Sequence, residues 1–415
     1  MRTRSKVDAT PALNVHRRTS GADFLPGPTR LLIVLVVSGL LGPGGIAPAE
    51  AQSIWVTPSF GVTEAYDSNV TLSSNPTSDF VTSLIPGLAL EFKDYPFTLT
   101  LSAGLTMQVY AENPSLDTYT DNVAFSGALS YAPTSRLTLS LSDTYTRNVN
   151  PALVTPDVAI TTGRFASTSN TVTPALSYKL DPLTTATLAY SMNVLRSDSS
   201  FATDSTTHTF TGGVSRALTP IVSGGVQYVY SLFQVSEQPD IDTHSPQITL
   251  AVHWGPTITV TSSTGPIWIK QFDGSYKLDY TTSTQYAQVF SKGQGLISLG
   301  YSRTTGTGGV TGIISTTQSV SGTASFQASQ ALMLTVGAGW SKTESTGSGS
   351  TGSTLDVTNY TASATLTYRL LSWLNFVASY RYLQQQGTGA AAGVSDLRDN
   401  VITLGLTATE KFRLY

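Results

Sequence analysis

The sequence has no cysteine and few charged residues. The absence of cysteine excludes a disulfide framework, a thiolate metal site and a cysteine nucleophile. Asp, Glu, Lys and Arg make up 12% of the 415 residues, roughly half of their usual share in a soluble domain. With a formal net charge of −3, the chain offers no basic surface for nucleic acid. Serine, threonine, glycine and asparagine replace the charges, a composition that suits a thin wall between lipid and water.

Long apolar runs are also missing, except near the N-terminus. Arg30 is followed by LLIVLVVSGLLG, which is too short to span a bilayer and has the length of a signal-peptide core. Ala49-Glu50-Ala51 has the small-x-small form of a cleavage site. We therefore interpret residues 1–51 as a signal peptide cleaved before Gln52, and residues 52–415 as one exported domain. The Arg17-Arg18 pair lacks the following Phe and Leu of a twin-arginine signal.

A two-residue alternation of apolar and polar side chains fills the exported domain. In PFTLTLSAGLTMQV (96–109), every second residue from Phe97 to Val109 is apolar, and the residues between are small or polar. A strand places alternate side chains on opposite faces, so each such segment has one apolar and one polar face. The same pattern recurs to the end of the chain, for example in TATLAYSMNV and NYTASATLTYRL, and no segment shows a helical period.

Short turns and long polar loops alternate between these segments. Eight short turns imply eight hairpins, and a first and a last strand bring the expected total to about 18 strands, within a range of 16–18. Long loops are predicted at YDSNVTLSSNPTSD, TRNVNPALVTPDVAITTGR, TSSTGPIWIKQFDGS and KTESTGSGSTGSTLD. Within 256–292 the assignment is the least regular, because Trp268 and Phe272 fall where a loop is expected. The short turns are KDYP (93–96), APTS (132–135), LDPL (180–183), ALTP (217–220), WGP (254–256), KGQG (292–295), QASQ (327–330) and LLSW (370–373).

Aromatic residues near the strand ends indicate that the apolar face meets lipid. Phe97 and Tyr110 are separated by a span that would rise roughly 25–30 Å along a tilted strand, the height of an outer-membrane apolar band. A sheet in lipid must close, because an open edge would leave backbone groups unpaired. We therefore predict an all-β fold, a transmembrane antiparallel up-and-down β-barrel in the outer membrane of a Gram-negative-type bacterium, with short periplasmic turns and long extracellular loops. A soluble β-sandwich or β-helix is the alternative. The predicted aromatic girdle is Tyr110, Tyr131, Tyr178, Trp254, Trp340, Tyr368, Trp373 and Tyr380.

The polar face would line a lumen wide enough for an aqueous channel. Its few charges have both signs, which predicts weak ion selectivity, unlike pores with charge rings of one sign. Hydroxyl-rich walls suit neutral hydrated solutes such as sugars, although threonine and serine are also simply small residues that fit strands. The predicted pore-lining residues are Glu91, Thr98, Thr100, Ser102, Thr106, Gln108, Lys179, Arg369 and Arg381.

The start of the exported domain, WVTPSFGVTEAYDSNVTLSS, resembles a family of bacterial outer-membrane β-barrel proteins associated with exopolysaccharide production and export loci. The resemblance rests on Pro58 and on the run from Glu64 through Tyr66-Asp67 to Asn69-Val70, with related pieces at 120–123 and 398–401. It implies a porin-like channel for small solutes or for exopolysaccharide, with no catalytic residues to carry over. Members of outer-membrane families often end in Phe, whereas this chain ends in Tyr415, an aromatic residue that still suits the barrel-assembly machinery.

Other functions have less support in the residues. A surface barrel with a lumen plugged by its own loops would serve a structural or adhesive role without conducting. A membrane-embedded hydrolase would need His208 or His253, but no serine is singled out beside them. Asp67, Asp121 and Asp399, each close to an asparagine, would suit calcium or, more simply, Asx turns. We predict no enzyme activity, no cofactor and no metal site. The expected partners are outer-membrane lipid, the assembly machinery and polysaccharide or small sugars, and the sequence leaves the oligomeric state open.

Overall fold

The computed structural model describes residues 53–154, 163–199, 202–236, 238–271, 273–290, 294–307, 314–345, 356–388 and 396–414. The predicted signal peptide, its cleavage site and Tyr415 lie outside these ranges. The strands are β1 (Ser53–Asp67), β2 (Asp79–Asp94), β3 (Phe97–Leu105), β4 (Met107–Tyr110), β5 (Val123–Tyr131), β6 (Leu137–Asn148), β7 (Ser167–Lys179), β8 (Thr184–Ser197), β9 (Ser205–Ala217), β10 (Val222–Val235), β11 (Ile241–Trp254), β12 (Ile258–Lys270), β13 (Tyr276–Phe290), β14 (Gly295–Thr307), β15 (Ile314–Gln327), β16 (Leu332–Ser345), β17 (Asp356–Arg369), β18 (Leu374–Thr388), β19 (Leu397–Thr409) and β20 (Phe412–Arg413).

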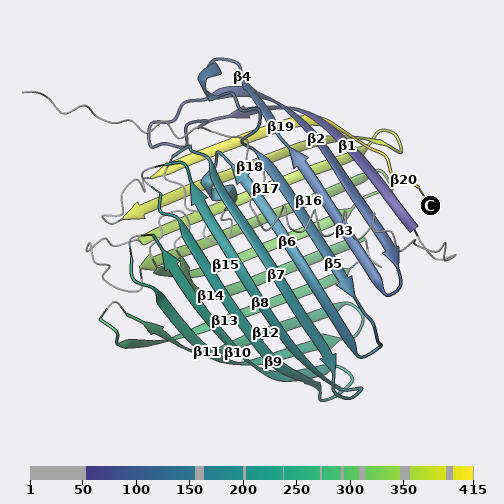
Figure 1. The fold of residues 1–415 in the computed structure, drawn as a ribbon. Helices are drawn as coiled ribbons and strands as arrows, with labels where there is room; N and C mark the ends of the chain where they lie inside the picture. The colour runs from purple at the N-terminus through teal and green to yellow at the C-terminus, as the bar shows by residue number, and fades with distance from the viewer. Residues whose placement is uncertain are drawn as a thin grey trace, which may run out of the picture. The chain divides into compact units, whose positions relative to one another are not determined.

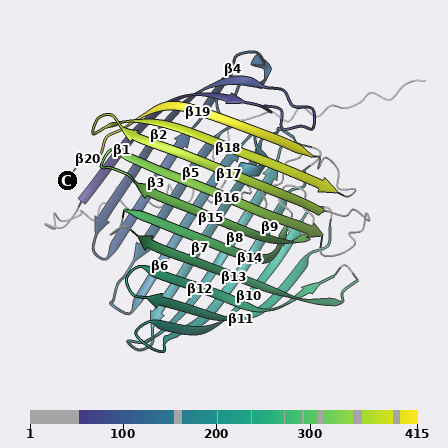
Figure 2. The ribbon, with the colours of Figure 1, turned by 180° about the vertical axis from the view of Figure 1, so that it is seen from behind.

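The strands form one closed antiparallel sheet (Figures 1 and 2). Each strand pairs with its neighbours in sequence, and β1 pairs with both β2 and β19, which closes the barrel. β3 and β4 are two parts of one strand, interrupted where the register sets Leu105 opposite Pro86, which has no N–H to donate. β20 is a short continuation beyond β19 that pairs with the start of β1. The predicted barrel of 18 strands is thus confirmed.

Seven of the predicted short turns join the strands where expected, and they gather at the right and lower right of Figure 1. The eighth, KGQG (292–295), lies largely outside the described residues. One predicted loop is wrong. Residues 261–275 were expected to form a loop, but β12 continues to Lys270, and Trp268 lies on it, opposite His244 of β11. Gly265 and Pro266 look like turn residues, yet a Cβ on Gly265 would lie 2.0 Å from the Pro246 carbonyl oxygen. Close approach of β11 therefore explains the glycine better than a turn does.

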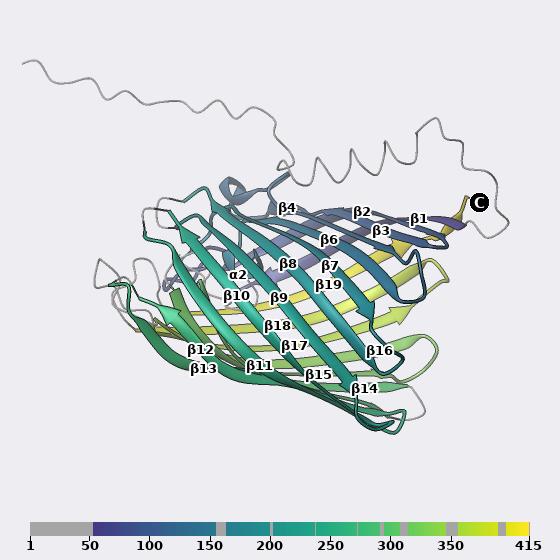
Figure 3. The same cartoon turned by 60° about the horizontal axis from the view of Figure 1, so that its bottom comes forward.

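The outward face of the barrel is apolar and exposed. On β2, Phe80, Leu84 and Leu88 are 53%, 39% and 53% exposed, while Val81 and Ser83 between them are buried. The register carries this alternation unchanged around the barrel and back across the β1–β19 seam, where Val62 lies opposite Leu406. Figure 3 shows the runs β6–β9 and β14–β18 as opposite walls of the barrel.

Buried side chains concentrate at the long-loop end of the barrel. Apart from Leu99 and Thr184, every buried side chain lies in the half of its strand nearest the long loops, or in those loops. Two short helices, η1 (Pro114–Leu116) and α2 (Pro151–Val154), belong to loops at this end. In the described ranges no helix is both long and apolar enough to cross a membrane. The short-turn half of the interior, by contrast, contains none of the apolar clusters found among the described residues.

Candidate functional site: the barrel interior

Hydroxyl and amide side chains cover the inward face. They hydrogen-bond across neighbouring strands, as do Ser102 with Ser126 at 2.7 Å and Ser298 with Thr323 at 2.7 Å. Each bond uses one of several donor and acceptor positions on a hydroxyl, so the wall keeps further positions for water or solute. Similar pairs are Thr173–Ser191, Thr209–Ser231, Gln227–Gln247, Ser302–Ser319 and Ser325–Thr335.

The predicted pore-lining residues all occupy inward register positions. Thr98, Thr100 and Ser102 alternate with the outward Phe97 on β3, and Thr106 and Gln108 continue the series. Glu91, Lys179 and Arg369 lie beside short turns, and Arg381 lies in the other half of the barrel. The structure therefore separates the four charges into two groups. Their role in conduction stays a prediction.

At the short-turn mouth, Glu91 forms ion pairs with Lys93 and Lys411. Lys411 and Arg413 also stack on the ring of Trp55, with the Lys411 ammonium 4.7 Å from the ring centre. The C-terminal extension is thereby held against β1 and β2. Sequence reasoning found Glu91 but missed its partners, because Lys411 is 320 residues away in the chain.

Most of the predicted girdle lies on the outward face. Tyr131, Tyr178, Trp340, Tyr368 and Tyr380 share the register positions of exposed apolar residues, and Tyr131 stacks on Phe97 with ring centres 4.4 Å apart. Trp254 and Trp373 are exposed at short turns. Tyr110 was wrongly assigned to the girdle. The alternation that turns Val109 outward turns Tyr110 inward, where it is 5% exposed.

Among the residues that the structure describes, three apolar clusters fill parts of the interior at the long-loop end. The first joins Val70, Val81, Tyr110 and Leu116, and the second joins Val154 and Leu195 with Phe165 and Ala202. The third contains residues of β10, β11, β12 and β15. Because most of these side chains come from inward positions or from loops, they narrow the interior at this end. The third cluster consists of Phe233, Val235, Ile241, Ile267, Ile269 and Ile314.

Arg164 fastens three loops together at this end. Its guanidinium donates to the carbonyl of Leu116 at 2.7 Å and of Val70 at 3.4 Å, and it bonds and stacks on Tyr110. Asp79 has a similar role, accepting from the backbone N–H groups of Glu112 and Asn113. Sequence reasoning missed both residues. Of the two, only Asp79 could have been noticed in the sequence, because it stands at the start of a predicted strand.

A polar pocket of about 230 Å³ lies beside Arg164. It is lined from β1 by Asp67, from β4 by Gln108, from β6 by Asn148 and, on the other side of the seam, from β18 by Arg381. Arg381 pairs with Asp399 at 3.3 Å. The remaining lining residues are Val70, Leu72, Thr106, Tyr110, Asn122, Val149, Asn150, Leu153 and Arg164.

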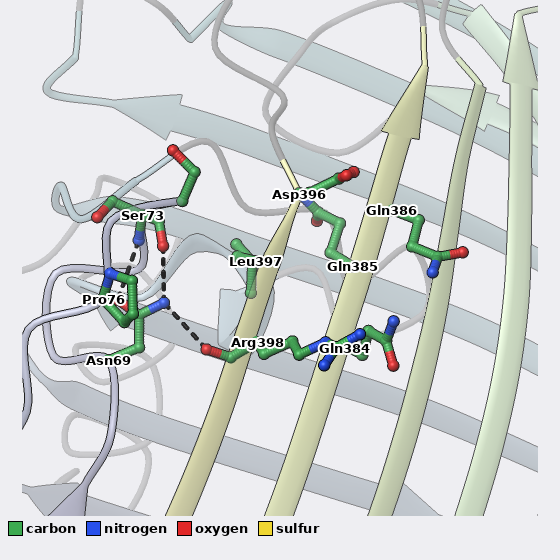
Figure 4. Close-up of a pocket in the computed structure, with 10 residues that line it drawn as sticks. Asn69, Ser73, Pro76, Gln384, Gln385, Gln386, Asp396, Leu397 and Arg398 are labelled. Atoms are coloured by element: carbon green, nitrogen blue, oxygen red, sulfur yellow. Dashed lines mark hydrogen bonds between the residues drawn. The ribbon is translucent and has the colours of Figure 1, made fainter.

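A second pocket, of about 250 Å³, lies where the β1–β2 loop meets the ends of β18 and β19 (Figure 4). Asn69 forms its side toward β1, donating from its amide to the carbonyls of Ser73 at 2.8 Å and Arg398 at 3.0 Å. The second bond crosses the seam where the barrel closes. Gln384 and Asp396 are among the side chains around it.

The histidines and acidic pairs show no assembled catalytic or metal site in the described part of the chain. His208 bonds to Tyr190 at 2.8 Å and Gln234, and His253 bonds to Thr259. Among the described residues, no hydrogen bond joins a serine hydroxyl to either ring. No group of three or more His, Cys, Asp or Glu residues is arranged to hold a metal ion among these residues. The Asp67 carboxylate accepts the Asn69 N–H at 2.8 Å, which confirms the Asx turn predicted there.

Comparison with protein-family models gave no match, and comparison with curated proteins gave no relative. Solved structures with a similar outline include the outer membrane protein OpdK of Pseudomonas aeruginosa, at 9% identity and a TM-score of 0.42, covering 86% of this chain and 99% of that one. Acinetobacter baumannii OccAB4 has 12% identity and a TM-score of 0.44, covering 86% and 98%. Pseudomonas aeruginosa OccK3 has 10% identity and a TM-score of 0.45, covering 88% and 97%. Structural similarity at this level supports no conclusion about activity.

The structure itself locates the protein. A closed sheet with exposed apolar side chains around its outer face is stable in a bilayer, where every backbone group must be paired within the protein. Barrels with short turns at one end and long loops at the other span bacterial outer membranes. The protein lies in the outer membrane of a Gram-negative-type bacterium.

Proposed function

We propose that this protein is an outer-membrane channel for small hydrophilic solutes. The observation that carries the proposal is the inward face of the short-turn half, where most side chains are hydroxyls, amides or small residues that are open to solvent. A barrel of this size leaves room for water inside. The predicted pore-lining threonines and serines would then line a neutral vestibule on the periplasmic side. Ion pairing of Glu91, and of Arg381 with Asp399, supports weak ion selectivity.

Export of exopolysaccharide is a narrower form of the same proposal. The hydroxyl-rich vestibule suits a hydrated sugar chain, and the sequence resemblance to barrels of polysaccharide loci favours it. The apolar clusters at the long-loop end oppose free exit of a chain. An export role would therefore require the long loops to move.

The same clusters favour a second candidate, a non-conducting surface barrel closed at its outer mouth. Single-channel recording of the refolded chain from Gln52 to Tyr415 in a planar bilayer separates the two. Steady conductance steps with weak selectivity support the channel. A folded barrel that stays silent overturns the channel and supports the surface barrel.

A further inference from the structure

The pocket shown in Figure 4 lies at the long-loop rim, beyond the ladder that closes the barrel. That ladder ends at Asp67 and Val401, and the bond from the Asn69 amide to the Arg398 carbonyl then spans the seam at 3.0 Å. The volume of about 250 Å³ is below the roughly 300–1,000 Å³ of pockets for drug-sized ligands. The pocket therefore has room for one small unit.

Two side chains of this pocket are held at one atom and open at another. The Tyr382 hydroxyl donates to the side-chain oxygen of Gln384 at 2.7 Å, and the Gln384 amide nitrogen has no partner among the described residues. The backbone N–H of Gly387 donates to one oxygen of Asp396 at 2.9 Å, and the other oxygen accepts no hydrogen bond from those residues. Each side chain is thus fixed in position and keeps hydrogen-bonding capacity.

Three further polar side chains in the lining have no partner within the described chain. Arg398 lies opposite Gln384 in the β18–β19 ladder, and its guanidinium forms neither an ion pair nor a hydrogen bond there. The same holds for the Gln386 amide and the Ser74 hydroxyl. A guanidinium only donates and a carboxylate only accepts, whereas amides and hydroxyls do both. The pocket therefore offers donors and acceptors together.

The charges of the pocket balance. Arg398 and Asp396 are the charged residues in its lining, and no ion pair joins them. An anion would be attracted by one and repelled by the other, and so would a cation. A zwitterion would pair with both but would leave the neutral amides and the hydroxyl unused. A neutral ligand with several hydroxyls uses all of these groups, because each hydroxyl both donates and accepts.

We propose that this pocket binds one unit of a neutral glycan at the outer rim of the barrel. Sugar hydroxyls would accept from Arg398 and Gln384 and donate to Asp396. Further hydroxyls would bond to Gln386 and Ser74. The binding does not depend on conduction, but its use in polysaccharide export rests on the proposed channel.

A glycan array probed with dye-labelled proteoliposomes tests the proposal, because many barrels on one vesicle raise the avidity for weakly bound sugars. With vesicles of phospholipid alone, neutral glycans should retain roughly tenfold more barrel than acidic glycans. Arg398→Gln should lower retention on neutral glycans roughly tenfold, the value of one hydrogen bond to a charged group. Arg369→Gln, at a short turn, is the matched control and should be retained like the unmodified barrel.

Asp396→Asn gives a readout that a merely structural role would not produce. The variant keeps an oxygen for the Gly387 N–H, and it leaves the pocket with a positive charge. Retention should therefore shift from neutral toward acidic glycans. Gln285→Leu, at an exposed inward position of the short-turn half, should leave retention unchanged. A loss in this variant alone would place the sugar in the vestibule and overturn the proposal.

Equal retention on neutral and acidic glycans, or retention on neither, also overturns the proposal. Displacement of the vesicles by free alanine would assign the pocket to a zwitterion instead. Loss of retention when the vesicles contain lipopolysaccharide would overturn the assignment to a free glycan in favour of headgroup sugars. Single-channel recording tests the proposed function separately. A silent barrel that binds neutral glycans keeps the pocket and refutes the channel.

Discussion

The two ends of the barrel interior are built on different principles. In the short-turn half, most inward side chains are small, hydroxylated and solvent-exposed, and hydroxyls of neighbouring strands hydrogen-bond to each other at the surface of the lumen. In the long-loop half, inward side chains are buried in apolar clusters and in hydrogen-bond networks that tie loops to strands. Stability from packing is therefore concentrated at one end, and space for solute at the other.

This difference has a functional consequence. A wide neutral vestibule imposes little selection on small solutes, whereas a narrow packed end controls which solutes pass. Any selectivity of the proposed channel should accordingly follow substitutions at the long-loop end and be insensitive to single substitutions in the vestibule.

The largest effect on stability is expected from the third apolar cluster. Ile269 is 0% exposed, and Ile269→Ala should lower the free energy of unfolding by about 3 kcal/mol, because it removes buried methyl groups and leaves a cavity. Thr261→Ala, at an exposed inward position on the same strand, should change it by less than about 0.5 kcal/mol. Urea unfolding in detergent, followed by tryptophan fluorescence, measures both. Similar losses of unfolding free energy in the two variants would contradict the proposed difference in packing between the two halves of the barrel.

The next largest effect on stability is expected from substitution of Asp79. Its carboxylate accepts the N–H groups of Phe80, Glu112 and Asn113, and Asp79→Ala should cost about 2 kcal/mol because it removes the charged acceptor that these three N–H groups share. Asp79→Asn keeps one acceptor oxygen and should lose less. If the β4–β5 loop helps to narrow the outer mouth, single-channel current should also rise in the alanine variant. A current equal to that of the unmodified protein would show that this loop does not limit conduction.

A smaller effect is expected at the seam. Asn69→Ala removes the bonds to Ser73 and Arg398 and should cost about 1 kcal/mol (Figure 4). Because one of these bonds joins the β1–β2 loop to β19, faster amide hydrogen exchange is expected at the start of β19. Ser74→Ala, in the same loop, is the control. Exchange confined to the loop would show that Asn69 does not hold the seam.

The smallest effect on stability is expected at the short-turn end. The backbone N–H of Leu183, the Thr184 side chain and Arg216 lower the pKa of the exposed Asp181 below 3.8. A carboxyl whose pKa falls on folding stabilises the folded state above its unfolded pKa, and this contribution is lost as pH falls through the folded pKa. The stability difference between the unmodified protein and Asp181→Ala should be constant above about pH 5 and shrink toward about pH 3. Urea midpoints across this range test it, and a difference that grows on acidification would contradict the assignment.

Prediction from sequence worked where the signal was local. The alternation in residues 96–109 gave the two faces of β3 and β4, and the spacing of turns such as LDPL gave the strand order. It failed at residues 261–275, where Gly265 and Pro266 have the composition of a loop. The glycine is needed there because the backbone of β11 approaches it closely. It failed also at Tyr110. The prediction followed the aromatic residue type, whereas the alternation of inward and outward positions along the strand turns this side chain inward.

The sequence alone determined the barrel, its closure and its polar inner wall, because a period of two residues and the length of each turn are properties of short segments. Only the tertiary structure decided what occupies the outer end. Arg164 meets Tyr110 across 54 residues of sequence, and Asn69 meets Arg398 across 329. Such contacts depend on where the closed sheet brings the loops, and no local pattern records them. The pocket beside Arg164 exists for this physical reason, since its lining comes from β1, β4 and β6 on one side of the β1–β19 seam and from β18 on the other.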